Sequence, residues 1–277
     1  MRLRHAPWEE NADFAIGLRA ISPDAWLEGG EADPAVRKDP LIAAHPAETW
    51  AETEGSREAQ AEALALVEVA LGRHIAAEGQ APLLAAARAT ADDLCLMQRR
   101  DGDWRLTALC LCAPTFFTAA QVIGRSLADL HAPVEGFAER FLTRTRRVFD
   151  GLRQDLVLER RNWTLVNAAE RFMPSAAAMR AQIPEIDPAE SGRVLHLRVE
   201  RQTLRRLPRT DSALFTIRVW ITPLADLAED RDRLSAFAKA WRSATPTFRN
   251  YKQLALYDRL IEVFLRAEGE NYSVNGN

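Results

Sequence analysis

The chain lacks the motifs by which most nucleotide-dependent and metal-dependent proteins are identified. It has no GxxxxGK[ST] loop and no GxGxxG fingerprint, so neither of the usual phosphate-binding loops is present. It has no HExxH motif and no GxSxG elbow. Its three cysteines (Cys95, Cys110 and Cys112) have no CxxC spacing, so neither zinc nor a cysteine-held iron–sulfur cluster is supported. If the protein is a redox enzyme, its electrons come from another protein.

Long apolar runs and excess charge are also missing. No stretch is long and apolar enough to span a bilayer, and the first residues, MRLRHAPWEENADF, lack the apolar segment of a signal peptide. The formal net charge of the 277 residues is -3, which argues against nucleic acid as the main partner. Few cysteines, all in apolar strand-like segments, favour a reducing compartment. We therefore expect a cytoplasmic protein with no nucleic-acid or membrane partner.

The periodicity of the apolar residues predicts an α+β fold. Strands are expected in a hairpin over 92–112 with Asp101 and Gly102 at its turn, in 156–166, and in the two arms of 193–221. Because these strands come in antiparallel pairs and do not alternate with helices, a doubly wound sheet is disfavoured. The expected architecture is one curved antiparallel sheet with helices around it. Helices are predicted at residues 56–78, 81–90, 119–131, 135–150, 224–243 and 252–267.

We expect a single domain over residues 1–277. Residues 1–90 are predicted to form a helical wrapping segment, residues 91–223 the core sheet, and residues 224–277 the C-terminal helices. The stretch 167–192 is irregular and rich in proline, and it either covers a cavity or crosses the surface.

The stretch 193–221 also carries an unusual density of charge in a segment that otherwise has the pattern of a core sheet. A buried cation without a partner is costly, so these side chains need carboxylate partners or solvent. The carboxylates belong either to the protein or to an acidic ligand. The charged residues concerned are Arg198, Glu200, Arg201, Arg205, Arg206 and Arg209.

Among the histidines, His131 stands out because it ends a predicted helix just before Pro133, a restriction that holds the imidazole beside the sheet. It is either a helix-terminal histidine favoured by the helix dipole or an axial ligand, since neutral imidazole suits haem iron. His196 alternates with Arg198 and Glu200 and is expected on a polar face. The remaining three, His5, His45 and His74, are expected to be ordinary surface or packing residues.

Several blocks resemble the haem-dependent oxidative N-demethylase family (alpha-subunit-like, formerly a domain of unknown function). ERQTLRRLP (Glu200–Pro208) followed by ALFTIRVW (Ala213–Trp220) is similar to the family signature. Three further blocks match in the same order: ADDLCLM (91–97), the CAP…IGRSL…HAPV stretch (112–134) and Arg161-Asn162-Trp163. A weaker match, IGLR…DAWLE, lies near the N-terminus. Four ordered blocks are much more specific than any one of them.

The resemblance implies a PAS-like sheet that holds haem b with a histidine on the iron. It implies a monooxygenase-type oxidoreductase that uses O2 to remove a methyl group from a small methylated amine and releases formaldehyde. A separate reductase or ferredoxin-type donor would supply the electrons. The oligomeric state is left open, a homo-oligomer included.

The resemblance also suggests roles for individual residues. His131 becomes the leading axial ligand, with a backbone carbonyl near the helix exit as acceptor for its other ring nitrogen. Arg205 and Arg206, with Arg201 behind them, become candidates for binding the haem propionates, because arginine binds carboxylates bidentately. The alternative is that Glu200 and other acids hold these arginines in structural ion pairs.

Arg161, Asn162 and Trp163 are expected to line the same pocket, where Asn162 would hold bound oxygen or an amine. Trp163 is otherwise a core residue. Glu200 either attracts the cationic amine or forms a buried pair with an arginine. Arg161, Asn162 and Glu200 are therefore the candidate catalytic residues.

The sequence departs from the family pattern at three positions. Phe117 stands where the family tends to have Trp, Val122 where it tends to have Lys, and Glu135 where it tends to have a second Pro. If these positions shape the pocket, the substrate differs. Two other functions remain open: a PAS-like sensor of haem or a small ligand, and a haem-free binding module without turnover.

Overall fold

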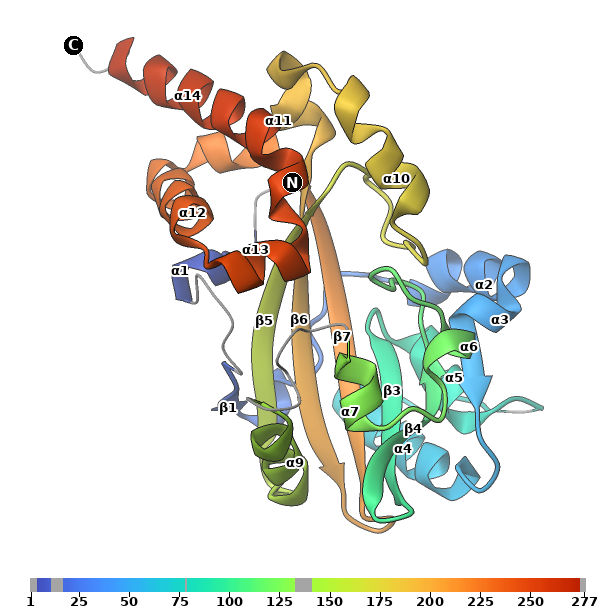
Figure 1. The fold of residues 1–277 in the computed structure, drawn as a ribbon. Helices are drawn as coiled ribbons and strands as arrows, with labels where there is room; N and C mark the ends of the chain where they lie inside the picture. The colour runs from blue at the N-terminus through green and yellow to red at the C-terminus, as the bar shows by residue number, and fades with distance from the viewer. Residues whose placement is uncertain (1–3, 11–16, 78, 133–140, 275–277) are drawn as a thin grey trace.

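The computed structural model describes residues 4–10, 17–77, 79–132 and 141–274, and within these ranges a seven-stranded sheet forms the centre (Figure 1). The strand order is β1-β5-β6-β7-β3-β4-β2, and every neighbouring pair is antiparallel. This confirms the predicted α+β class with flanking helices. The strands are β1 Arg19–Ile21, β2 Trp50–Glu52, β3 Asp93–Arg100, β4 Asp103–Cys110, β5 Val157–Val166, β6 His196–Leu207 and β7 Ser212–Pro223.

Both predicted hairpins form, and each has a residue in the left-handed region at its turn. Asp101 and Gly102 take positive φ values of 52° and 78° at the β3–β4 turn, and Asp211 takes 52° at the β6–β7 turn. Aspartate and glycine tolerate this left-handed region better than branched side chains do. The turn brings Leu207 opposite Ser212 and thereby sets the register along the whole β6–β7 pair.

The two edge strands were not predicted. β1 pairs with the start of β5, and β2 pairs with the end of β4. Each has three residues, which is too short for an alternating pattern to be visible in the sequence. The N-terminal segment therefore supplies strands as well as helices. Its helices are α1 Pro7–Glu10, η1 Pro23–Ala25, α2 Pro34–Ala44, α3 Pro46–Thr49, α4 Arg57–Leu71 and α5 Pro82–Ala89.

The single helix predicted over 119–131 is wrong. The structure has two short helices there, α6 Ala119–Val122 and α7 Leu127–His131. Gly124 lies between them at φ 75°, which no continuous helix allows. Each helix also begins with its own capping box, in which a Thr or Ser side chain bonds to the third helical N–H. Helix α4 likewise ends earlier than predicted, because Gly72 caps it in the left-handed region.

The remaining helices lie between the later strands and after them. Helix α9, Leu142–Asp150, falls in the predicted 135–150, whose first six residues, Phe137 among them, lie outside the described ranges. The helix predicted over 252–267 starts later, because Gln253 takes a φ of 52° and ends the preceding helix, α13 Pro246–Lys252. The other elements are α10 Ala177–Ala181, η2 Ile183–Glu185, η3 Pro188–Glu190, α11 Ser191–Val194, η4 Leu224–Glu229, α12 Arg231–Ser243, η5 Leu254–Tyr257 and α14 Asp258–Val274.

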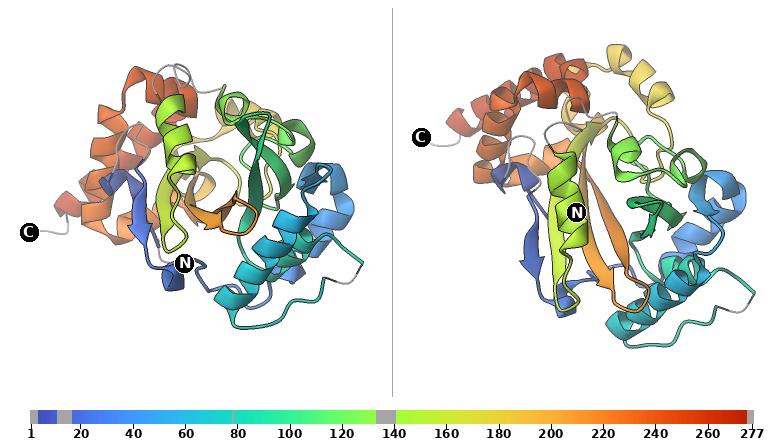
Figure 2. Two further views of the ribbon diagram at one scale, coloured as in Figure 1. Left: turned by 90° about the horizontal axis from the view of Figure 1, so that it is seen from below. Right: turned by 60° about the horizontal axis from the view of Figure 1, so that its bottom comes forward.

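Helices cover both faces of the sheet. Apolar residues of α4 and α5 pack with Leu94, Leu96 and Leu214 on one face, and residues of α12 and α14 pack with Trp163 and Trp220 further along it. Residues of α6, α7 and α9 pack against the opposite face, which points toward the viewer in Figure 1. Seen from below, α4 and α9 lie on either side of the β6–β7 hairpin (Figure 2). No helix in the described ranges is long and apolar enough to cross a membrane.

Candidate active site

Strand alternation divides the predicted site residues between the two faces of the sheet. Paired residues of antiparallel strands lie on the same face, and successive residues lie on opposite faces. Asn162 pairs with Glu200, whereas the neighbouring Arg161 pairs with Arg201. Asn162 and Glu200 therefore lie together on one face, which we call the site face. Arg161, Trp163 and Arg201 lie on the other, so the predicted common pocket for residues 161–163 is not formed.

Arg201 is a buried structural cation. Its side chain donates to the Glu159 carboxylate and to the backbone carbonyls of Trp26 and Ala25, at 2.6 and 2.7 Å. With a relative exposure of 1%, it has no room for a propionate. The placement of Arg201 agrees with a structural ion pair and not with a propionate partner, because acceptors of the protein already occupy the N–H groups of its guanidinium.

Arg161 and Trp163 also have roles within the protein. Arg161 forms an ion pair with Glu159 at 3.1 Å. The Trp163 indole packs in the core, with ring-centroid distances of 5.8 Å to Trp8 and 5.7 Å to Phe237. The core interpretation of Trp163 is therefore the one that its contacts favour.

Arg205 and Arg206 point to opposite faces, so one ligand does not pair with both. The Arg205 guanidinium lies 4.6 Å from the Trp26 ring centroid on the face of Arg201. Arg206 is on the site face, but it pairs with Asp211 and donates to the Phe149 carbonyl at 3.3 Å. It is also six residues along β6 from Glu200, roughly 20 Å at the usual rise of a strand. The motif arginines therefore do not converge on a common site.

Glu200 is the centre of a polar cluster on the site face. One carboxylate oxygen accepts from the Thr115 hydroxyl and lies 3.6 Å from Arg198 Nε. The other accepts from Gln202 at 2.9 Å and from Asn162 Nδ2 at 3.4 Å. A carboxylate has about four acceptor positions, so its neighbours nearly saturate it. We call Thr115, Arg160, Asn162, Arg198, Glu200, Gln202 and Lys252 the site-face cluster.

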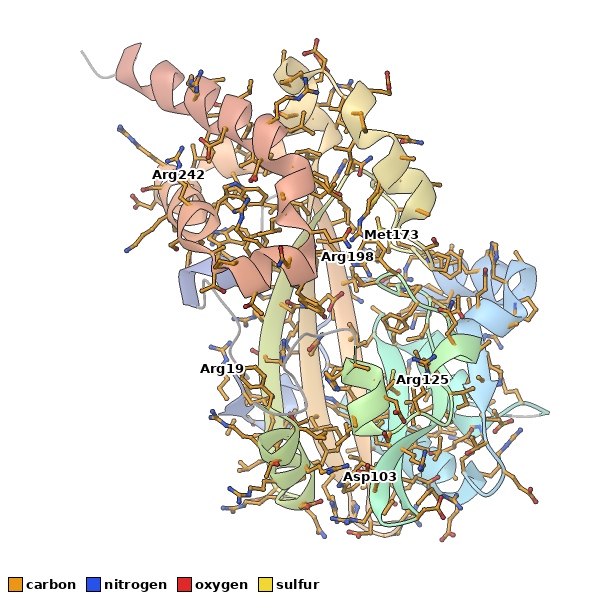
Figure 3. All side chains as sticks on the ribbon, in the orientation of Figure 1. Arg19, Asp103, Arg125, Met173, Arg198 and Arg242 are labelled. Carbon is orange, nitrogen blue, oxygen red and sulfur yellow. The ribbon has the colours of Figure 1, made fainter. Side chains whose placement is uncertain are left out.

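The fully buried Arg198, labelled on β6 in Figure 3, joins this cluster to two loops. It donates to Thr115 Oγ1 at 2.8 Å and to the carbonyls of Ala113 and Arg171 at 2.6 and 3.0 Å. The loop after β4, which contains Ala113, is held by Asp93. The Asp93 carboxylate accepts hydrogen bonds from the N–H groups of Cys112 and Ala113 at 2.9 and 2.8 Å. The start of β3 therefore determines where Arg198 finds its acceptors.

These contacts keep Glu200 ionised. Burial by itself raises the pKa of its carboxyl group, but the charge of Arg198, the Thr115 hydroxyl and the charge of Lys252 more than offset this. The result is a pKa below the usual value of a glutamate. Glu200 thus contributes a fixed negative charge to the cluster.

Lys252 belongs to the cluster, although no pattern in the sequence predicted it there. It is the last residue of α13, is 9% exposed, and its Nζ donates to Asn162 Oδ1 at 2.8 Å. Since an ammonium only donates, the amide oxygen of Asn162 must face Lys252, and the NH2 group then faces Glu200. No local signal marks this lysine, because a single lysine in a polar helix is normally on the surface.

Arg160 is a second member of the cluster that was not predicted; the neighbouring Arg161 was predicted instead. It precedes Asn162 by two residues on β5 and therefore shares the site face with it. No ion pair joins Arg160 to any carboxylate of the described residues. Burial lowers the pKa of Arg160, and the charge of Glu200 partly offsets this. Period-two alternation along β5 was the signal that could have identified it.

His131 ends α7 with a defined tautomer. Its Nδ1 lies 2.8 Å from the Leu127 carbonyl, one turn earlier. A carbonyl only accepts, so Nδ1 carries the proton and Nε2 carries the lone pair. Burial lowers the pKa of His131 while this hydrogen bond raises it, and the nearby charge of Arg160 lowers it further. A neutral imidazole whose second nitrogen is held by a carbonyl is the form that binds metals.

The remaining predicted positions lie around this cluster. His196 is on the site face at the start of β6, with Nδ1 3.0 Å from the Val194 carbonyl. Val122 is buried in the apolar cluster under α6, and Phe117 packs against the same cluster. Glu135 is outside the described residues. A buried apolar environment suits valine at 122, where the family tends to have lysine.

The buried Lys252 predicts a pH dependence of stability. Burial lowers its pKa to about 8, against about 10.4 in an unfolded chain. Between these values the unfolded chain binds more protons, so the free energy of unfolding contributed by Lys252 rises with pH, by up to roughly 3 kcal/mol. Urea unfolding of wild type and Lys252→Met at pH 7.5 and pH 9.5, without cofactor, measures this. If the free energy of unfolding changed between the two pH values by the same amount in wild type and in Lys252→Met, the predicted contribution of Lys252 would be contradicted.

A family model described as haem-dependent oxidative N-demethylase, alpha subunit-like, matches residues 67–261. The matched range is well over half of the 277 residues and contains β3 to β7, His131 and the whole site-face cluster.

Proposed function

The chain belongs to the haem-dependent oxidative N-demethylase, alpha-subunit-like family, and we propose that it binds haem b and demethylates a small methylated amine. In the proposed reaction one N–CH3 bond of the amine is broken. O2, two electrons and two protons are consumed, and the demethylated amine, formaldehyde and water are released. When bound, the haem would supply the redox-active iron at which O2 is reduced.

The observation that carries the proposal is the state of His131. The Leu127 carbonyl holds its Nδ1 proton, and Nε2 carries a lone pair on a neutral ring. The positive charge of Arg160, a member of the site-face cluster, also lowers the pKa of this imidazole. This donor set fits haem, which needs an uncharged imidazole for its iron and cations for its propionates. We propose His131 as the residue that would hold the iron.

For the amine we propose Glu200 and Asn162. Glu200 stays ionised, and its contact with Asn162 Nδ2, at 3.4 Å, is a weak hydrogen bond. A substrate ammonium that replaces this contact would gain a carboxylate acceptor, and the Asn162 amide would remain fixed by Lys252. Arg161 has no part in this proposal, since it lies on the other face.

The electrons come, in our proposal, from a separate reductase or ferredoxin-type protein. The family name refers to an alpha subunit, which supports the presence of a partner subunit. We further propose that residues 91–223 form a PAS-like haem core within a single domain, and that the protein works in the cytoplasm, without nucleic acid or membrane, as a monomer or a homo-oligomer.

Formaldehyde release tests the reaction. The haem-loaded protein is supplied with NADPH, a ferredoxin reductase and a ferredoxin as surrogate donors, and with a series of methylated amines in air. We expect formaldehyde equal to the amine demethylated. For Glu200→Gln we expect kcat/KM to fall by about 10- to 100-fold, the loss of one charge-assisted hydrogen bond. Haem bound without formaldehyde from any amine would favour the sensor, and no haem bound would favour the binding module.

A further inference from the structure

The site-face cluster contains more positive than negative charge. Three cations, Arg160, Arg198 and Lys252, surround the one carboxylate of Glu200. They come from β5, β6 and α13, so segments far apart in the sequence bring them together (Figure 1). Buried charges of one sign need a counter-charge. Within the site-face cluster, one negative charge stands against three positive ones.

The carboxylate of Glu200 forms an ion pair with Arg198. Arg198 Nε lies 3.6 Å from Glu200, and the rest of its guanidinium donates to backbone carbonyls and to Thr115. All of its nitrogens therefore have partners inside the protein. The pair is neutral as a unit, which leaves the surplus on the other two cations.

Arg160 and Lys252 carry that surplus. Lys252 Nζ makes one hydrogen bond, to the neutral amide of Asn162, so two of its three donors remain for another acceptor. Neither cation forms an ion pair with a carboxylate of the described ranges. Both face the side of the sheet on which His131 lies. Two cations that have no carboxylate partner among the described residues, on the face where the partly buried imidazole of His131 lies, form a site for a ligand with two negative groups.

We propose that Arg160 and Lys252 are the binding partners of the two haem propionates. Haem b carries two carboxylates, which equals the surplus of two positive charges, and the arginines of the LRRLP motif are either occupied or on the wrong face. The inference rests on the proposed function, because haem is the ligand. It moves the propionate site from the β6–β7 turn to the middle of the sheet.

A charge-deleted ligand tests this assignment. Haem and its dimethyl ester, which lacks the propionate charges, are titrated into the chain, and the Soret absorbance gives each Kd. We expect wild type to bind haem at least about 10-fold more tightly than the ester. Arg160→Met and Lys252→Met should each lose about 10- to 100-fold in affinity for haem and little for the ester. Lys252→Arg should retain most of the affinity, because it keeps the charge.

Arg205→Met and Arg206→Met are the matched controls, since each removes an arginine outside the site-face cluster, and both should bind haem as wild type does. Equal wild-type affinity for haem and ester would overturn the assignment, as would loss in the control variants alone. Unchanged haem affinity in Arg160→Met and Lys252→Met would also overturn it while leaving the haem protein intact. A wild-type chain that binds neither porphyrin would refute the proposed function itself. Circular dichroism of each variant verifies that it is folded.

Discussion

Replacing His131 with alanine is expected to remove or shift the Soret band of the haem-loaded protein. The affinity for haem is expected to fall by about 100-fold or more. The imidazole is neutral, its Nδ1 proton is held by the Leu127 carbonyl, and the lone pair is therefore on Nε2. Removing an axial ligand costs more than removing the group that orients it, which already costs 10- to 100-fold. The measurement is the absorption spectrum of both proteins, expressed with ample haem precursor and titrated with haem.

His196→Ala is the matched control. His196 is on the site face too, and its Nδ1 is also held by a carbonyl, that of Val194. It stands four residues before Glu200 on β6, roughly 13 Å away. We expect its variant to keep the wild-type band. An unchanged band in His131→Ala, together with a lost band in His196→Ala, would move the iron ligand to His196.

Replacing Arg198 with leucine is expected to lower the free energy of unfolding by about 3–5 kcal/mol, because it leaves the buried Glu200 carboxylate without its main counter-charge. It also removes the donor to the Ala113 and Arg171 carbonyls. Urea unfolding at pH 7 measures the loss. Arg153→Leu is the control, since its ion pair with Asp155 is exposed to solvent and should contribute little to stability.

A second variant separates charge from packing. Adding Glu200→Gln to Arg198→Leu removes the orphaned charge, so part of the lost stability should return, and the double-mutant cycle gives the coupling. The pKa of Glu200 is held below its usual value, so the stability it contributes is present above pH ~4.3, the unfolded value, and is lost as the pH falls through the folded value. The difference between wild type and Arg198→Leu should therefore shrink in acid. If the loss of unfolding free energy in Arg198→Leu did not depend on pH and was not restored by Glu200→Gln, the contribution of Arg198 to stability would come mainly from packing and not from charge.

Features that depend on neighbouring residues were predictable. The period-two pattern of β6 and β7, their turn at Asp211 and the α+β class follow from local rules. The same is true of the carbonyl partner of His131, because Leu127 is one helical turn away. Where local signals compete, as at Gly124, the prediction of one long helix was wrong, since a single positive φ outweighs an apolar stripe.

The sequence by itself determined the strands, the turns and the family blocks, because short-range sterics and hydrophobic alternation act between residues close in the chain. The tertiary structure alone decided which cations meet Glu200. Lys252 reaches Asn162 across 90 residues, and Arg198 reaches Thr115 across 83. Such contacts depend on where α13 and the loop after β4 pack, which no local pattern encodes. The sheet register decides on which face of the sheet each arginine lies. It places Arg160 on the site face and Arg161 on the opposite face.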